Sequence, residues 1–155
     1  MKVLIIDYGM GNLGSVRTAV QVLGFKADIV STPQLLTNAD KVILPGVGSF
    51  SDAMSEIKNN NWFDQLSEHV INEKKPILGI CLGMQLLATT GQEGGKTKGL
   101  DFISGEVNHL TKLGCKKPIP HVGWNDIHIK NAGALFNGIE SGNDFYFVHS
   151  YCFLP

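Results

Sequence analysis

The residue best suited to chemistry in this chain is Cys81, at the centre of Gly79-Ile80-Cys81-Leu82-Gly83. Glycines two positions before and after a nucleophile are the signature of a nucleophile elbow, here with cysteine in place of serine. A buried strand over Pro76–Ile80 leads into it, and a helix over Met84–Ala88 leads out. Such a turn lifts the sulfur to the carboxyl end of the sheet and the amino end of a helix, where the thiolate is favoured. We predict that Cys81 is a nucleophile rather than a structural cysteine.

A nucleophile that attacks an acyl group needs backbone amides that stabilise the oxyanion it creates. The amide of Leu82 is the first donor by the geometry of an elbow. The second should come from the loop Leu44–Phe50, which leaves the preceding strand and carries two glycines. Glycine amides can approach a substrate closely. We therefore predict an oxyanion hole from Leu82 and from Gly46, Val47 and Gly48.

A second glycine pattern lies near the N-terminus, in "DYGMGNLGSV" (7–16). Gly9, Gly11 and Gly14 have the G-x-G-x-x-G spacing of a dinucleotide-binding turn. That function also needs an acidic residue at the tip of the second strand, and Asp28 falls inside the strand instead. We expect these glycines to form a tight strand-to-helix turn, with no bound cofactor.

Strands alternate with helices along the first part of the chain and predict an α/β fold. We expect a flavodoxin-like, mostly parallel central sheet with helices on both faces, followed by a β-rich C-terminal part, all in one domain over 1–155. The Val16, Ala19, Val20 and Leu23 spacing gives one face of a helix ended by Gly24. The other expected elements are strands at 2–7, 27–30, 41–44, 100–110, 119–129 and 145–153, and helices at 49–58 and 62–73, the first with a capping box from Ser49 and Asp52.

Composition excludes several classes of function. With 13 basic and 14 acidic residues, the chain has no basic stripe that would indicate nucleic-acid binding. No apolar run is long enough to cross a bilayer or to act as a signal peptide. Three cysteines, an odd number, favour a cytoplasmic protein with reduced thiols. Cys115, His121 and His128 fit no usual zinc spacing, so we expect no metal site.

Four segments together, "LPGVGSF", "GICLGMQLL", "PHVGWN" and "FVHSY", resemble the class I (triad) glutamine amidotransferases. Within that family, they are most similar to the glutaminase subunits of imidazole glycerol phosphate synthase. The resemblance covers the whole chain. It implies that Cys81 attacks the side-chain amide of L-glutamine to form a glutamyl thioester. Ammonia would then pass to a (β/α)8-barrel synthase partner in a heterodimer that serves histidine biosynthesis.

The resemblance also assigns roles to other residues. Gly46, Val47 and Gly48 match the oxyanion strand, and Gln85 matches a residue that holds the substrate. His149, Ser150 and Tyr151 match the segment that binds the backbone end of glutamine. The residues that match surfaces facing the synthase are Asn12, His121, Trp124 and Asn125.

The chain departs from the family pattern at one point. The family completes its triad with a His-x-Glu pair, and none of the five histidines here has a glutamate two residues later. The general base is therefore not among these residues, and we expect the sequence to be a shortened form of a longer enzyme, with His149 a poor substitute base. Three alternatives stay open: a subunit that feeds a sugar-modifying synthase for surface polysaccharides, a catalytically incomplete subunit that only binds its partner, and a different cysteine hydrolase on the same fold.

Overall fold

The structure is a computed structural model that describes residues 1–131 and 133–155. The chain divides into two compact units. The first comprises Met1–Asn108 together with Phe153–Pro155, and the second comprises His109–Cys152. The single-domain organisation stays a prediction.

The first unit is built on a sheet of four parallel strands in the order β2-β1-β3-β4. These strands are β1 (Val3–Ile6), β2 (Ala27–Val30), β3 (Lys41–Gly46) and β4 (Ile77–Cys81). β1 is buried along its whole length, as expected of an apolar strand covered on both faces. All four strands lie where the sequence predicts them, to within two residues.

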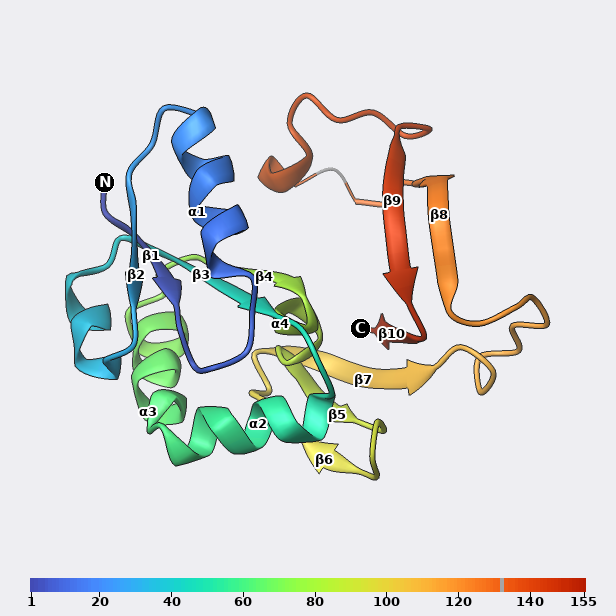
Figure 1. Cartoon of the computed structure of the whole chain (residues 1–155), viewed down its shortest axis with the longest axis horizontal. Coiled ribbons are helices and arrows are strands. Elements are labelled where there is room, and N and C mark those ends of the chain that lie inside the picture. The colour runs from blue at the N-terminus through green and yellow to red at the C-terminus, as the bar shows by residue number, and fades with distance from the viewer. Residues whose placement is uncertain (132) are drawn as a thin grey trace. The chain divides into compact units, whose positions relative to one another are not determined.

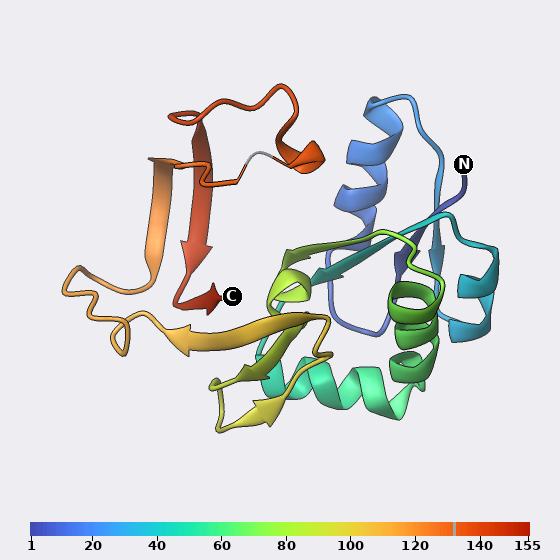
Figure 2. The same cartoon turned by 180° about the vertical axis from the view of Figure 1, so that it is seen from behind.

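Helices cover both faces of this sheet (Figures 1 and 2). On one face, α1 (Leu13–Val22) packs Leu13, Val16 and Val20 against the apolar side chains of β1, β2 and β3. On the other lie α2 (Phe50–Asn59), capped by the Ser49 hydroxyl, and α3 (Trp62–Ser67). The α/β fold is confirmed. The helix face predicted for α1 is only partly right, because Ala19 and Leu23 are exposed.

A second sheet has the strand order β10-β7-β5-β6. It contains β5 (Ala88–Gly91), β6 (Thr97–Lys98), β7 (Ile103–His109) and β10 (Tyr151–Leu154). Short 3-10 turns occur at η1 (Pro33–Asn38) and η3 (Ala134–Phe136).

The second unit contains an antiparallel ribbon of β8 (His121–Asp126) and β9 (Asp144–His149). Strands thus dominate after residue 95, as predicted. The single strand predicted over 145–153 is wrong, because the chain breaks at Ser150 into β9 and β10, which belong to different sheets.

The helix predicted over 62–73 changes its winding midway. α3 ends at Ser67 and continues as a π-helical turn, η2 (Glu68–Asn72). This turn buries His69, whose side chain is 1% exposed, and its Nδ1 lies 3.9 Å from the carboxylate of Glu73, beyond hydrogen-bond range. Burial lowers the pKa of His69, and the nearby Lys75 ammonium lowers it further.

This burial predicts how stability depends on pH. The ordinary pKa of histidine is about 6.5, so below that pH His69 is protonated in the unfolded chain. In the folded chain its lowered pKa keeps it neutral to a lower pH. The free energy of unfolding should therefore be at its full value above that pH and fall between pH 7.5 and 5.5. Urea unfolding measured at both pH values, with His69→Leu as the control, tests this. If the variant loses as much stability as the parent over this interval, His69 is not the cause.

Candidate active site

The turn at Cys81 has the strained backbone of a nucleophile elbow. Cys81 has φ 54° and ψ −116°, a conformation that L side chains rarely adopt, and the residue is exposed. The two flanking glycines are required sterically. A Cβ added at Gly83 would lie 1.8 Å from the carbonyl oxygen of Leu44, and one at Gly79 would lie 2.4 Å from the Cα of Met84. The elbow therefore closes only because both positions lack a side chain.

The glycine loop after β3 lies directly beside this elbow. β3 and β4 pair in parallel, and the register places Gly46 opposite Cys81. Gly48 has φ +111°, which only glycine adopts readily, and Val47 between the two glycines is 55% exposed. Leu82 is buried and is the first residue of the short helix α4, so the helix itself does not use its amide. The structure thus brings together the nucleophile and the residues predicted for the oxyanion hole.

The helix after the elbow is shorter than predicted. α4 spans Leu82–Gln85, whereas the sequence pattern predicts a helix over 84–88. The carbonyl groups of Leu86 and Ala88 accept hydrogen bonds from Leu100 and Asp101 instead of continuing the helix. The dipole argument for a favoured thiolate therefore rests on one helical turn. Gln85, half-buried at the end of that turn, lies four residues after Cys81.

The N-terminal glycine loop supports the oxyanion loop. The hydroxyl of Tyr8 would lie 2.5 Å from a Cβ at Gly46, and the terminal methyl of Met10 would lie 2.5 Å from one at Gly48. Tyr8 is buried, and its hydroxyl has no hydrogen-bond partner in the described part of the chain. Burial, and then the charge of a Cys81 thiolate, raise the pKa of Tyr8. Sequence reasoning missed Tyr8 and Met10, because neither belongs to a recognisable motif.

Asn12 in the same loop has a structural role that its sequence context did not predict. It is the N-cap of α1, and its side-chain oxygen accepts a hydrogen bond of 3.3 Å from the amide of Ser15. A second cap links distant parts of the chain: the carboxylate of Glu93 accepts a hydrogen bond of 2.9 Å from the amide of Phe50, at the start of α2. No local sequence pattern predicts this contact, since the two residues are 43 positions apart.

The remaining predicted residues lie in the second unit, in the ribbon or directly after it. His149 ends β9, with Ser150 and Tyr151 directly after it, and His121 begins β8. The predicted partner-facing residues do not share one face, because side chains alternate along a strand. His121 and Asn125 lie on one face and Trp124 on the other.

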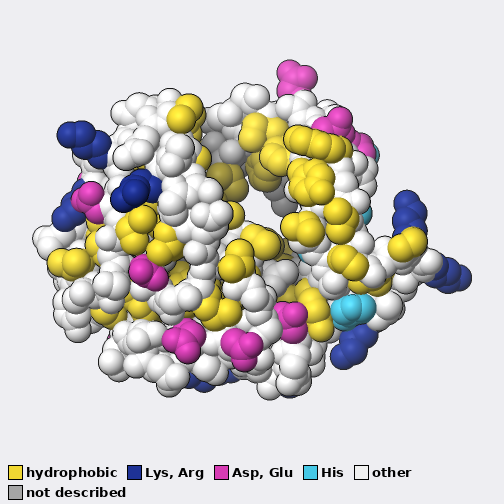
Figure 3. Space-filling model, in the orientation of Figure 1, with side chains coloured by type: hydrophobic (Ala, Val, Ile, Leu, Met, Phe, Trp, Pro, Cys, Tyr) yellow, Lys and Arg dark blue, Asp and Glu magenta, His cyan; other side chains and the backbone are white. Residues whose placement is uncertain are grey.

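Trp124 belongs to an apolar face formed by two cross-strand pairs. Its ring meets Tyr146 edge-on at 5.6 Å, and Val122 is paired with Val148. All four side chains are more than half exposed. Figure 3 shows hydrophobic side chains gathered over this ribbon.

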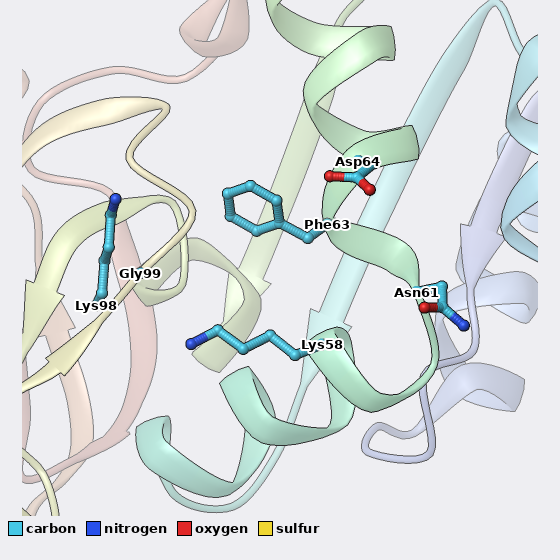
Figure 4. Close-up of a pocket in the computed structure, with 6 residues that line it drawn as sticks. All are labelled: Lys58, Asn61, Phe63, Asp64, Lys98 and Gly99. Carbon is cyan, nitrogen blue, oxygen red and sulfur yellow. The ribbon is translucent and has the colours of Figure 1, made fainter.

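Elsewhere in the first unit, a pocket of about 310 Å³ opens between α2, α3 and β6 (Figure 4). It contains none of the predicted site residues, and its lining residues are Lys58, Asn61, Phe63, Asp64, Lys98 and Gly99. No group of three or more potential metal ligands occurs within 1–131 and 133–155. In the same residues, no helix is long and apolar enough to span a membrane.

Known proteins resemble this chain along nearly its whole length. Residues 4–155 match the family model described as glutamine amidotransferase class-I. The imidazole glycerol phosphate synthase subunit HisH of Moorella thermoacetica is 48% identical over 153 residues, which cover 99% of this chain and 71% of that protein. The subunit of the same name from Aquifex aeolicus is 44% identical, with 100% of this chain and 73% of that protein covered.

Two solved structures have the same fold, and both are glutamine amidotransferases. The first superposes with a TM-score of 0.73 at 16% identity, covering 97% of this chain and 72% of that one. The second, from Thermotoga maritima, superposes with a TM-score of 0.62 at 20% identity, covering 99% of this chain and 62% of that one. At these identities the likeness concerns the fold alone.

Proposed function

The chain belongs to the class-I glutamine amidotransferase family, and we propose that it is the glutaminase subunit of an imidazole glycerol phosphate synthase. The geometry that carries the chemistry is an exposed, strained Cys81 with Gly46 opposite it in the sheet. The link to histidine biosynthesis rests on relatives that are 44% and 48% identical over nearly the whole chain. Three free cysteines agree with a reducing compartment, the cytoplasm.

The proposed reaction is hydrolysis of L-glutamine through a thioester. The thiolate of Cys81 attacks the carbon of the side-chain amide, and the carbonyl oxygen becomes an oxyanion. The amide of Leu82 and an amide of the loop Gly46–Gly48 donate hydrogen bonds to that oxyanion. When the C–N bond breaks, ammonia leaves and a glutamyl thioester remains on Cys81. Water then attacks the thioester, releases glutamate and restores the thiol.

Substrate binding involves two further segments in this proposal. Gln85 holds the glutamine near the elbow, and His149, Ser150 and Tyr151 hold its backbone end. A base must take the thiol proton, and an acid must give a proton to the leaving ammonia. His149 is poorly placed to be that base, because both its ring nitrogens are already hydrogen-bonded, to His121 and to the carbonyl of Tyr151.

The proposed partner is a (β/α)8-barrel synthase that receives the ammonia. The apolar face around Trp124 suits such a contact, because tryptophan and tyrosine side chains exposed together are typical of protein interfaces. Asn12, which is exposed, would supply a polar contact. Asn125 is also exposed, but it lies on the face of the ribbon opposite Trp124, so its contact with the partner rests on the resemblance alone. His121, on the opposite face from Trp124, is better explained by the role inferred for it below.

Covalent trapping tests the proposed function. The protein, in a form extended to include the family's His-x-Glu pair, is incubated with its synthase partner and a diazoketone analogue of glutamine, and the modified peptide is identified by mass spectrometry. The same extended form serves for every measurement of glutamate release. We expect labelling of Cys81 that excess glutamine prevents, and glutamate release that the partner accelerates. Partner binding without labelling would favour the non-catalytic alternative. Ester hydrolysis that glutamine does not inhibit would favour a different cysteine hydrolase.

A substitution at Asn12 separates its two roles. Asn12→Ala removes both the cap of α1 and the exposed carboxamide, and should destabilise the protein by about 1 kcal/mol. Asn12→Ser keeps a capping oxygen and loses only the carboxamide. If Asn12 contacts the synthase, both variants should lower partner-stimulated glutaminase activity, measured at saturating glutamine. Full stimulation of Asn12→Ser would reduce Asn12 to a helix cap.

A further inference from the structure

Two histidines of the second unit form a hydrogen-bonded pair across the ribbon. Nδ1 of His121 lies 2.9 Å from Nε2 of His149, and Nδ1 of His149 lies 2.9 Å from the carbonyl oxygen of Tyr151. We propose that His121 is a positioning residue for the glutamine site: it donates its Nδ1 proton to His149 and so holds the segment His149–Tyr151 in the shape that binds substrate. This inference rests on the proposed function.

The direction of both hydrogen bonds follows from the carbonyl group. A carbonyl oxygen only accepts, so Nδ1 of His149 carries a proton. In the neutral ring, Nε2 of His149 is then an acceptor, and the proton of the second bond must come from Nδ1 of His121. The pair therefore has one arrangement of protons when both rings are neutral. That arrangement fixes the orientation of the His149 ring relative to the backbone that follows it.

Packing holds His121 where it can make this donation. The register of β8 and β9 places His121 directly opposite His149. The ring of Phe147 stacks on the His121 ring, with centroids 5.0 Å apart and planes inclined by 24°. Gly123, opposite Phe147, has no side chain on that face, and both histidines are half-buried. The His121 ring is thus held by stacking on one side and by a hydrogen bond at its edge.

The consequence concerns substrate binding rather than the chemical step. The bond from His149 spans the junction of β9 and β10, where Ser150 lies. Without the proton from His121, the His149 ring can turn and release the carbonyl of Tyr151. The segment that holds the backbone end of glutamine would then be less ordered before binding. We expect KM for glutamine to rise while kcat changes little.

Two variants distinguish the effect of the hydrogen bond that His121 donates from the effect of its stacking on Phe147. His121→Phe keeps an aromatic ring on Phe147 and removes the donor, whereas His121→Asn keeps an N–H near the Nδ1 position and removes the ring. Each is made in the extended form that includes the His-x-Glu pair and is compared with the parent in that form, with the synthase partner present, for glutamate release. We expect His121→Phe to raise KM by about 10-fold, with kcat within about two-fold, and His121→Asn to stay within about three-fold of the parent in both.

Nitrogen NMR of protein with ¹⁵N-labelled histidine tests the hydrogen bond between His121 and His149 independently of activity. In the parent, Nδ1 of His149 should be protonated, and Nε2 should have the shift of a hydrogen-bonded acceptor that moves in His121→Phe. A proton on Nε2 of His149, an unchanged KM in His121→Phe, or an equal loss in His121→Asn would overturn the proposal. Absence of glutamate release from the parent would count against the proposed function instead, and the His149 spectra would then decide whether the pair exists.

Discussion

Replacement of Cys81 by alanine should reduce kcat for glutamine hydrolysis by at least about 10⁴-fold, because the covalent intermediate can no longer form. The protein should still fold, since the Cβ is kept and the side chain is exposed. Binding of glutamine should persist, because the residues proposed to hold it are unchanged. Glutamate release with the synthase partner present measures the first effect, and calorimetric titration with glutamine measures the second. Activity within 10-fold of the parent would remove Cys81 from the mechanism.

Cys81→Gly is a more informative companion variant. Alanine retains the strain of φ 54°, whereas glycine adopts that conformation without cost. We expect Cys81→Gly to be as inactive as Cys81→Ala but more stable by about 1 kcal/mol, by urea unfolding. Such a result would mean that the strained backbone that exposes the sulfur lowers the stability of the protein. Equal stability of the two variants would show that the surrounding turn relaxes.

The central sheet was predictable from sequence because its signals are local. Short apolar runs such as 3–6 and 41–44 are typical of buried parallel strands, and Ser49 marks the start of a helix. The elbow was predictable for the same reason, since two glycines, a cysteine and the preceding strand lie within a few residues. Gly46 and Cys81 are neighbours because each ends one of two adjacent parallel strands, whose carboxyl ends lie at the same edge of the sheet.

The errors arose where distant segments decide the local structure. The helix after Cys81 stops early because residues from Leu100 onward take its carbonyl groups. The tyrosine that supports Gly46 looks like an ordinary loop residue, and only the folded chain brings its hydroxyl to that glycine. The alternation of β8 separates His121 from Trp124, although a motif in sequence presents them as one surface.

Substitution of Gly83 by alanine should have the largest effect on folding of any glycine-to-alanine change in the first unit. The new Cβ would lie 1.8 Å from the carbonyl oxygen of Leu44, and backbone atoms of Leu44 and Pro45 surround the site. Because β3 is buried between two helix layers, it cannot move away from the elbow without disrupting the sheet. We expect a loss of about 3 kcal/mol or more in the free energy of unfolding. Thermal and urea unfolding measure it.

Gly14→Ala is the matched control, because the same methyl group is added where nothing lies within 4 Å apart from the adjacent residues and the backbone of the helix itself. Gly14 lies inside α1 and has an ordinary helical backbone, so alanine there should stabilise the protein by up to about 1 kcal/mol. If the two variants change the free energy of unfolding in opposite directions, the loss at Gly83 comes from the close packing around the elbow and not from the replacement of glycine in general. If Gly83→Ala unfolds like the parent, β3 and the elbow must have shifted apart. Gly46 would then no longer face Cys81, and glutaminase activity should be lost although the protein remains folded.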